Sequence, residues 1–326
     1  MNESQPHSPG ERFAAARVPF FLGTLPFGST VEETAATAIL DRFREAGGTL
    51  LDTANNYVTW LPGHTGDESE NLLGRWLRSR GARDEMYLAT KLGAREDPRR
   101  SGEFPANAEG LSAGVVRGRA EDSMRRLGTD RIDLLYAHID DDATPVEETV
   151  RAFASLVTEG SVGALGCSNH AVWRIERARA TARALGLPGY RCVQQRYTYL
   201  RPAPGADFGI QRHLESELLE YAAGDPELAL LGYSALLFGA YTRADKPVPP
   251  QYEHPDSVER LRVLRDAARE LGVTANQLVL AWLWGGSPRV VPVVGVSTVA
   301  QLDECLGAVD LEIPDEVRKR LDTAGG

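Results

Sequence analysis

Short apolar segments alternate with longer amphipathic segments along almost the whole chain. The short segments are rich in β-branched and large apolar residues, and they predict eight β-strands. These strands are expected over residues 18–24, 49–54, 85–91, 132–138, 162–168, 192–197, 228–234 and 290–295. Apolar residues at helical spacing predict helices over residues 31–46, 67–80, 112–127, 146–158, 171–185, 212–223, 257–271, 275–284 and 298–307.

Local signals mark the ends of some predicted helices. Thr30 and Glu33 have the spacing of a capping box, which predicts the start of the first helix, and Gly47 follows its predicted end. Gly128 follows the helix over 112–127 in the same way.

The regular alternation of strands and helices predicts parallel strands joined by helical crossovers. Eight such units close naturally into a single-domain (β/α)₈ TIM barrel, which we expect over residues 14–326. An open doubly wound sheet is the alternative, but no G-x-G-x-x-G follows the first predicted strand and no Walker A motif occurs. Residues 1–13 lack an apolar segment and are expected to form a disordered tail.

Composition and charge narrow the function classes. Hydrophobic residues make up 42% of the chain and charged residues 25%, as in a globular protein, and no apolar run approaches the ~20 residues of a membrane span. The net charge of −10 disfavours binding to nucleic acid or to an anionic membrane. Three separated cysteines give no disulfide framework. We therefore expect a cytoplasmic enzyme with a small-molecule substrate.

Three predicted connections are longer than usual. They cover residues 92–111, 200–211 and 235–256, and each follows the carboxyl end of a predicted strand. Barrels of this type build their active sites at that end, and long loops in a compact domain are usually functional. We therefore expect the substrate to bind among these three loops.

Polar and ionisable residues gather at the predicted strand ends, and four of them could together transfer a proton. A tyrosine phenol has a pKa near ~10, and a neighbouring ammonium lowers it, so Lys91 is expected to tune Tyr57. Asp52 is the expected counter-charge for a buried Lys91, and His138 can donate a hydrogen bond to a carbonyl oxygen. Taken singly, each residue is also explained by loop capping or packing; the combination favours chemistry.

Three sequence strings carry a resemblance to a known family. LDTANNY (residues 51–57), ATKLG (89–93) and DLLYAHIDDDATP (133–145) resemble the tyrosine, lysine and histidine segments of the aldo-keto reductases. The resemblance implies that Asp52, Tyr57, Lys91 and His138 are a catalytic tetrad, with Tyr57 as the general acid in carbonyl reduction. The likeness extends over roughly residues 17–323.

The same resemblance implies a binding site for a nicotinamide cofactor, NADPH, with NADH as the alternative. Ser168, Asn169 and Gln194 are expected to hold the nicotinamide carboxamide, and Tyr233 to stack on the ring. The remaining expected cofactor contacts are Gly23, Thr24, Leu25, Ser234, Leu236, Gly295, Ser297, Gln301 and Glu304. Leu25 and Trp60 are expected in the wall of the substrate pocket.

The sequence also departs from the family pattern. Cys305 stands where many relatives have an adenine-binding Asn, and His170 replaces an aromatic residue after Ser-Asn. No lysine or arginine occurs over residues 296–301, where a 2′-phosphate would bind, although charged groups hold phosphate best. The acidic run over residues 140–142 lacks the spacing of a cation loop, so no metal site is expected.

The sequence therefore predicts an NAD(P)H-dependent oxidoreductase that reduces an aldehyde, ketone or keto-sugar to an alcohol. The alternative is a nicotinamide-binding regulatory subunit with weak or vestigial catalysis. A barrel hydrolase or isomerase, which would bind no dinucleotide, is a third reading. The expected partner is a small-molecule carbonyl or alcohol, and neither a nucleic acid nor a membrane is expected. The sequence predicts no oligomeric state.

Overall fold

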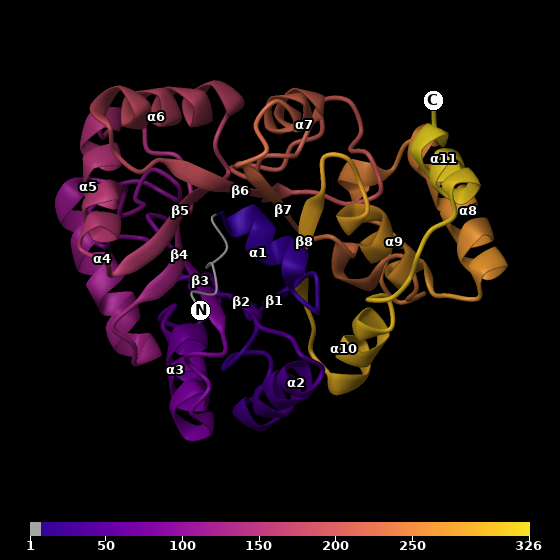
Figure 1. The fold of residues 1–326 in the computed structure, drawn as a ribbon, viewed down its shortest axis with the longest axis horizontal. Coiled ribbons are helices and arrows are strands. Elements are labelled where there is room, and N and C mark those ends of the chain that lie inside the picture. The colour runs from indigo at the N-terminus through magenta and orange to yellow at the C-terminus, as the bar shows by residue number, and fades with distance from the viewer. Residues whose placement is uncertain (1–7) are drawn as a thin grey trace, which may run out of the picture.

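The computed structural model describes residues 8–326, and its eight parallel strands form one closed barrel in the order β1-β2-β3-β4-β5-β6-β7-β8 (Figure 1). This confirms the predicted single-domain (β/α)₈ barrel. The strands are β1 (Phe21–Gly23), β2 (Leu50–Asp52), β3 (Tyr87–Leu92), β4 (Ile132–Ala137), β5 (Val162–Ser168), β6 (Tyr190–Arg196), β7 (Ala229–Tyr233) and β8 (Val290–Gly295).

The crossover helices surround the barrel, as the alternating pattern predicts. They are α2 (Glu33–Glu45), α3 (Glu68–Arg80), α4 (Ala113–Leu127), α5 (Val146–Thr158), α6 (Val172–Leu185), α7 (Ser216–Ala223), α8 (Pro255–Leu271), α9 (Ala275–Trp284), α10 (Val299–Leu306) and α11 (Asp315–Thr323). No pattern had predicted α11. None of the helices from Ser8 to Gly326 is long and apolar enough to cross a membrane.

The core has an inner and an outer layer. Alternate strand residues point into the barrel, as with Tyr87 and Ala89 of β3, and the opposite strand faces pack against the surrounding helices. Gly166 of β5 makes room for the inner layer, because a Cβ there would lie 2.5 Å from the ring of Tyr136. The inner layer fills the barrel interior, so the open carboxyl ends of the strands are left to carry the polar groups.

The expected disordered tail is wrong for residues 8–13. Helix α1 (Pro9–Ala15) begins there, with a capping box between Ser8 and Glu11. Phe13 is only 1% exposed, and its ring centroid lies 5.0 Å from Phe21 and 5.6 Å from Tyr87. The helix therefore closes the amino end of the barrel, opposite the predicted site. Residues 1–7 of the expected tail lie outside the described residues.

The helix ends show a second difference. The capping box expected at Thr30 and Glu33 is absent, because α2 begins after Glu32 and no side chain caps it. Gly128 ends α4 in the left-handed conformation, as predicted. Each of the three expected long loops follows a strand's carboxyl end, and the loop over residues 235–256 contains two short 3₁₀ turns, Leu237–Gly239 and Pro250–Tyr252.

Candidate active site

The predicted tetrad lies at the carboxyl end of neighbouring strands. Asp52 is the last residue of β2, Lys91 lies near the end of β3, and His138 directly follows β4. Tyr57 lies in the loop after β2, five residues beyond Asp52. Parallel pairing of β2, β3 and β4 brings these residues to one rim.

Lys91 lies at the centre of this group. It is 1% exposed, and its Nζ donates to Asp52 Oδ1 at 2.5 Å, Tyr57 OH at 2.6 Å and the main-chain oxygen of Thr53 at 2.8 Å. All three N–H groups of the ammonium therefore have an acceptor. A buried cation needs such partners because it has lost its hydration.

The Tyr57 hydroxyl lies between the two charged groups. It accepts a hydrogen bond from Lys91 and donates one to Asp52 Oδ1 at 3.1 Å. The His138 ring lies edge-on to the Tyr57 ring, with centroids 6.2 Å apart. The hydroxyl proton can therefore turn from Asp52 to another nearby acceptor by rotation about the C–O bond.

The pKa directions correct one expectation from the sequence. We expected Lys91 to lower the pKa of Tyr57, but burial and the Asp52 carboxylate raise that pKa well above its usual value. Burial also lowers the pKa of Lys91, against the opposing effect of Asp52. Tyr57 is therefore a protonated phenol at neutral pH, which is the form a general acid requires.

His138 is electrically neutral in this setting. Burial, together with the nearby Lys91 ammonium, lowers the pKa of His138 well below its usual value. Its Nδ1 is buried and has no hydrogen-bond partner in the described part of the chain. A neutral imidazole has one N–H to donate, so His138 can orient a carbonyl oxygen without adding a charge.

The residues expected to hold a nicotinamide carboxamide also lie together. Asn169 Nδ2 donates to Ser168 Oγ at 3.1 Å, and Asn169 Oδ1 accepts from Tyr233 OH at 2.7 Å. Gln194 Nε2 reaches across the barrel and donates to Asp52 Oδ2 at 2.8 Å. This hydrogen bond connects the residues expected to hold the carboxamide with the tetrad. Asn169 adopts φ 61°, a left-handed conformation that Asn tolerates better than most residues.

The residues expected at the adenosine end lie between β7, α9 and α10. The main-chain N–H of Ser297 donates to Gln301 Oε1 at 2.7 Å, and Asn276 Nδ2 donates to Glu304 Oε1 at 3.2 Å. Ser234 and Leu236 lie in the loop after β7, and Gly295 ends β8 with its surface exposed. Cys305 points into the hydrophobic core, so it does not replace the missing adenine-binding Asn.

Asn276 is a residue that the sequence pattern did not identify. Its Oδ1 is buried without a partner, although its Nδ2 is held by Glu304 and Thr242. In the sequence it stands inside the capping box of α9, so it is easily taken for a residue of the helix start.

Other expected residues have different surroundings. The Thr24 hydroxyl is fully buried and bonded to Ser69 Oγ and to the Asp52 main-chain oxygen, so it supports the rim from within. Leu25 is 40% exposed and Trp60 59% exposed. Both side chains are available at the surface to contact a ligand. Gly23 pairs with Asp52 and Gly295 in the barrel register.

Glu109 is a second residue that sequence reasoning missed. Its Oε1 accepts from Asn55 Nδ2 and from the main-chain N–H of Gly93, both at 2.8 Å. Its other oxygen accepts from Arg119 of α4 at 2.6 Å. The carboxylate therefore joins the loops that carry Tyr57 and follow Lys91. Its position 52 residues from Tyr57 leaves no local signal in the sequence.

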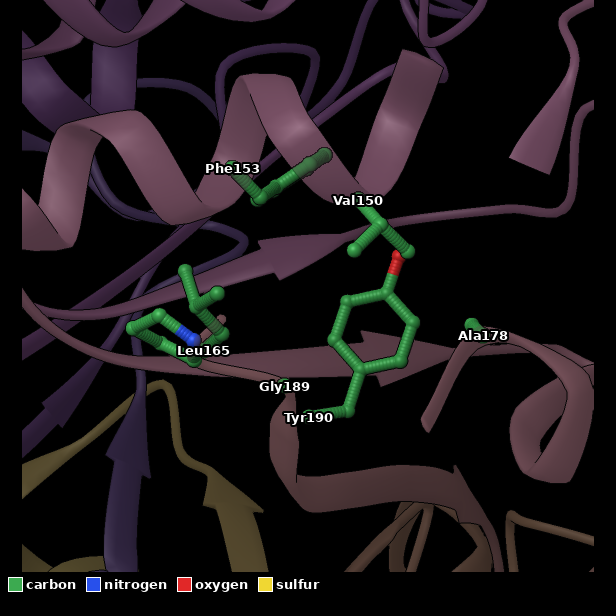
Figure 2. A pocket seen from close by; sticks show the side chains of 7 residues that line it. Val150, Phe153, Leu165, Ala178, Gly189 and Tyr190 are labelled. Carbon is green, nitrogen blue, oxygen red and sulfur yellow. The ribbon is translucent and has the colours of Figure 1, made fainter. Parts of the chain in front are cut away.

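Two other features do not form part of this site. A cavity of ≈ 10 Å³ lies between α5, β5, β6 and α6, and Figure 2 shows Val150, Phe153, Leu165 and Tyr190 around it. It offers about one water-sized space with apolar walls, too little for a substrate. The acidic run contains Asp140 and Asp142, which pair with Arg174, and residues 8–326 contain no cluster of acidic, His or Cys groups suited to a metal ion.

The polar groups at this rim fit a nicotinamide dinucleotide. Amide and hydroxyl groups of Ser168, Asn169 and Gln194 match the donors and acceptors of a carboxamide, and Tyr233 offers an aromatic face beside them. At the other end, the unpaired Asn276 Oδ1 is a free acceptor for an amino group. These two polar regions are connected by the loop after β7.

The comparison with known proteins agrees with this arrangement. The model of the Aldo/keto reductase family matches residues 19–325. Norsolorinic acid reductase stcV of Emericella nidulans is 34% identical over 314 residues, which cover 91% of this chain and 76% of that protein. The uncharacterized oxidoreductase YrpG of Bacillus subtilis is 32% identical over 312 residues, covering 92% and 90%. An aryl-alcohol dehydrogenase of Pestalotiopsis microspora is 28% identical over 318 residues, covering 93% and 78%.

Proposed function

Because this chain belongs to the aldo/keto reductase family, we propose that it reduces the carbonyl group of an aldehyde, ketone or keto-sugar to an alcohol, with Tyr57 as the general acid. This proposal rests above all on the position of the Tyr57 hydroxyl, which makes hydrogen bonds with both Lys91 and Asp52. A regulatory subunit that only binds nicotinamide has no need of a buried ion pair around a phenol.

The proton moves from Tyr57 to the substrate oxygen. Its raised pKa keeps the phenol protonated until a substrate oxygen takes the place of Asp52 as the acceptor. As the proton leaves, the Lys91 ammonium stabilises the phenolate oxygen at 2.6 Å. Asp52 balances the charge of Lys91, so the group needs no additional ion in its resting state.

His138 orients the carbonyl. A neutral imidazole N–H donates to the substrate oxygen and polarises the C=O bond, while the oxygen accepts the Tyr57 proton. Burial prevents His138 from becoming the proton donor itself at neutral pH. The general acid and the orienting donor are therefore separate residues.

Ser168, Asn169, Gln194 and Tyr233 are the proposed holders of the nicotinamide. When bound there, the reduced nicotinamide supplies the hydride that the carbonyl carbon accepts. The remaining proposed contacts along the cofactor are Gly23, Thr24, Leu25, Ser234, Leu236, Gly295, Ser297, Gln301 and Glu304. The exposed Trp60 is proposed as part of the substrate wall, together with Leu25.

The proposed cofactor is NADPH, with a modest preference over NADH. Ser297 and Gln301 lie at the start of α10, where the helix N-terminus favours an anion. The only side-chain donors in residues 296–301 are neutral, so a 2′-phosphate gains less there than from an arginine.

The test is a steady-state assay of NADPH oxidation with aromatic and aliphatic aldehydes, followed through the absorbance of the reduced cofactor. Aromatic substrates belong in the panel because one relative is named an aryl-alcohol dehydrogenase. Turnover of at least one carbonyl supports the proposal. Tight NADPH binding without turnover of any carbonyl or alcohol would leave the regulatory reading in its place.

A further inference from the structure

Arg196, the last residue of β6, is a buried arginine without an acidic partner. It is 7% exposed, yet no carboxylate within residues 8–326 lies within 4 Å of its guanidinium. Buried charged groups are normally paired, because desolvation of an isolated charge is costly. The chain has 46 acidic residues, so a shortage of carboxylates does not explain the unpaired charge.

Only neutral groups contact the Arg196 guanidinium. Nε donates to Tyr252 OH at 3.0 Å and Nη1 to Gln211 Oε1 at 2.7 Å, while the Phe208 ring lies 5.0 Å from the guanidinium carbon. His213 is the remaining neighbour, and burial together with Arg196 lowers the pKa of His213 to about 4. Nη2 donates to no protein atom of the described chain and is not sealed from solvent.

A second buried arginine shows what a purely structural role looks like here. Arg260 of α8 donates to the main-chain oxygens of Tyr199 and Ala324, which ties the C-terminal segment to the barrel. Its partners are backbone acceptors that the fold always supplies. Arg196 instead holds only two neutral side chains, both from loops at the carboxyl end of the barrel.

The position of Arg196 connects it with the proposed active site. Side chains two residues apart on a strand share a face, so Arg196 follows Gln194 by roughly 7 Å toward the rim. Gln194 contacts Asp52, and Arg196 pairs with Tyr233 in the register of β6 and β7. Strand β6 lies beside β7 in the barrel (Figure 1). The neighbouring Arg212 is exposed, and its main-chain N–H donates to Asn169 Oδ1 at 3.3 Å.

We infer that Arg196 binds the oxyanion, a carboxylate above all, of a substrate whose carbonyl lies at Tyr57. This inference rests on the proposed function and names its substrate class: carbonyl compounds with an anionic group several atoms from the reacting carbon. The guanidinium fork suits a carboxylate, because it can present two parallel N–H donors. The anionic group takes part in no covalent step, so the reduction keeps its balance of one hydride and one proton.

The experiment compares each acid with its own neutral ester. Succinic semialdehyde and 4-carboxybenzaldehyde are each measured beside their methyl esters, at one ionic strength, in wild type, Arg196→Met and Arg196→Lys. Loss of a charge-assisted hydrogen bond predicts that the acid/ester ratio of kcat/KM falls roughly 10- to 100-fold in Arg196→Met for at least one pair. Arg196→Lys keeps the positive charge without the planar guanidinium. Its acid/ester ratio should therefore lie between those of wild type and Arg196→Met.

The ratio separates recognition from stability. A loss of folded protein scales the rates for acid and ester equally and leaves their ratio unchanged. Arg191→Met is the matched control, because Arg191 lies on the same strand near the opposite end of the barrel, beside Glu227. Its acid/ester ratio should equal that of wild type.

Each other outcome counts against a specific proposal. An unchanged acid/ester ratio in Arg196→Met, with both substrates still reduced, overturns the oxyanion site and leaves the proposed function intact. A ratio that stays constant while the Kd for NADPH rises assigns Arg196 to a cofactor phosphate and also overturns it. A wild-type protein that reduces none of the four compounds or any other carbonyl overturns both proposals.

Discussion

Gln194 Nε2 lies 2.8 Å from Asp52 Oδ2, although the two residues are 142 positions apart in the chain. The contact crosses the mouth of the barrel from β6 to β2. One oxygen of Asp52 is therefore used by Gln194, while the other is shared by Lys91 and Tyr57. The residues proposed for cofactor binding and for proton transfer thus share one carboxylate, and their geometries are coupled.

Tyr57→Phe removes the proposed proton donor and keeps the ring. We expect turnover to fall by about 10²–10⁴-fold, the usual contribution of a general acid. The Kd for NADPH, measured by quenching of protein fluorescence, should stay near the wild-type value. Tyr87→Phe is the control, because Tyr87 lies at the amino end of the same barrel, beside α1. Near-normal turnover of the Tyr57 variant would contradict its assignment as the acid.

Lys91→Met leaves the Asp52 carboxylate buried without its counter-charge. Breaking such a pair costs about 3–5 kcal/mol of unfolding free energy, and Asp52→Asn should cost a similar amount because it isolates the ammonium. The double variant removes both charges and should be more stable than the sum of the single losses predicts. Urea unfolding of all three variants measures this coupling. Strictly additive losses would show that the pair is not coupled.

Turnover gives an independent readout of the same variants. All three variants should lose activity. In Lys91→Met and in the double variant, the phenolate of Tyr57 has no cation beside it. In Asp52→Asn, the Lys91 ammonium beside the phenolate has lost its counter-charge. Lys91→Arg tests the pure charge role, since arginine keeps the charge but not the compact geometry. Full activity in Lys91→Arg would reduce the role of Lys91 to charge balance.

Much of the fold follows from local sequence signals. Helix α5 keeps its predicted bounds because its apolar residues recur at helical spacing. Helix α9 keeps its bounds because a capping box at Thr274 and Gln277 marks its start and Gly285 follows its end. Helix α1 was missed because a helix of only seven residues, capped by Ser8 and Glu11, gains its stability from packing of Phe13 against the barrel, which no local pattern reveals.

Local sequence signals likewise predict some properties of the site and not others. Asp52, Lys91 and His138 could be predicted because each stands where an apolar strand ends, and parallel strands end at one rim. The direction of the Tyr57 pKa could not, because it depends on how completely the loops bury the phenol. The isolation of Arg196 is equally a tertiary property, since residues 208, 211 and 252 come from two distant loops.

The partly buried His213 predicts a dependence of stability on pH. Its pKa is about 4 in the folded protein, against roughly 6.5 when unfolded. As pH falls from 6.5 to 4, the unfolded chain binds a proton that the folded chain does not, so stability is lost in that window. The full shift corresponds to roughly 3 kcal/mol of unfolding free energy.

His213→Gln should flatten this dependence. Urea unfolding at pH 7 and pH 4.5 gives the loss of unfolding free energy over this pH range, and the losses of wild type and variant are compared. His64→Gln serves as the control, because His64 lies in a surface loop and its ring hydrogen-bonds only to the Pro62 main-chain oxygen. An identical loss of stability in wild type and His213→Gln would assign the pH dependence to other groups.

Cofactor choice depends on the start of α10. Ser297, Thr298 and Gln301 offer only neutral donors there, and neutral hydrogen bonds contribute about 0.5–1.5 kcal/mol each, against roughly 1.5–3 for charged ones. NADPH should therefore bind only modestly tighter than NADH in wild type, and Gln301→Arg should widen the difference by about tenfold. The dissociation constants of NADPH and NADH, measured for wild type and for Gln301→Arg at one ionic strength, test both expectations. Tighter NADH binding in wild type would contradict the NADPH proposal. An unchanged ratio in Gln301→Arg would move the phosphate site away from residues 296–301, because a new guanidinium within reach of a phosphate must strengthen its binding.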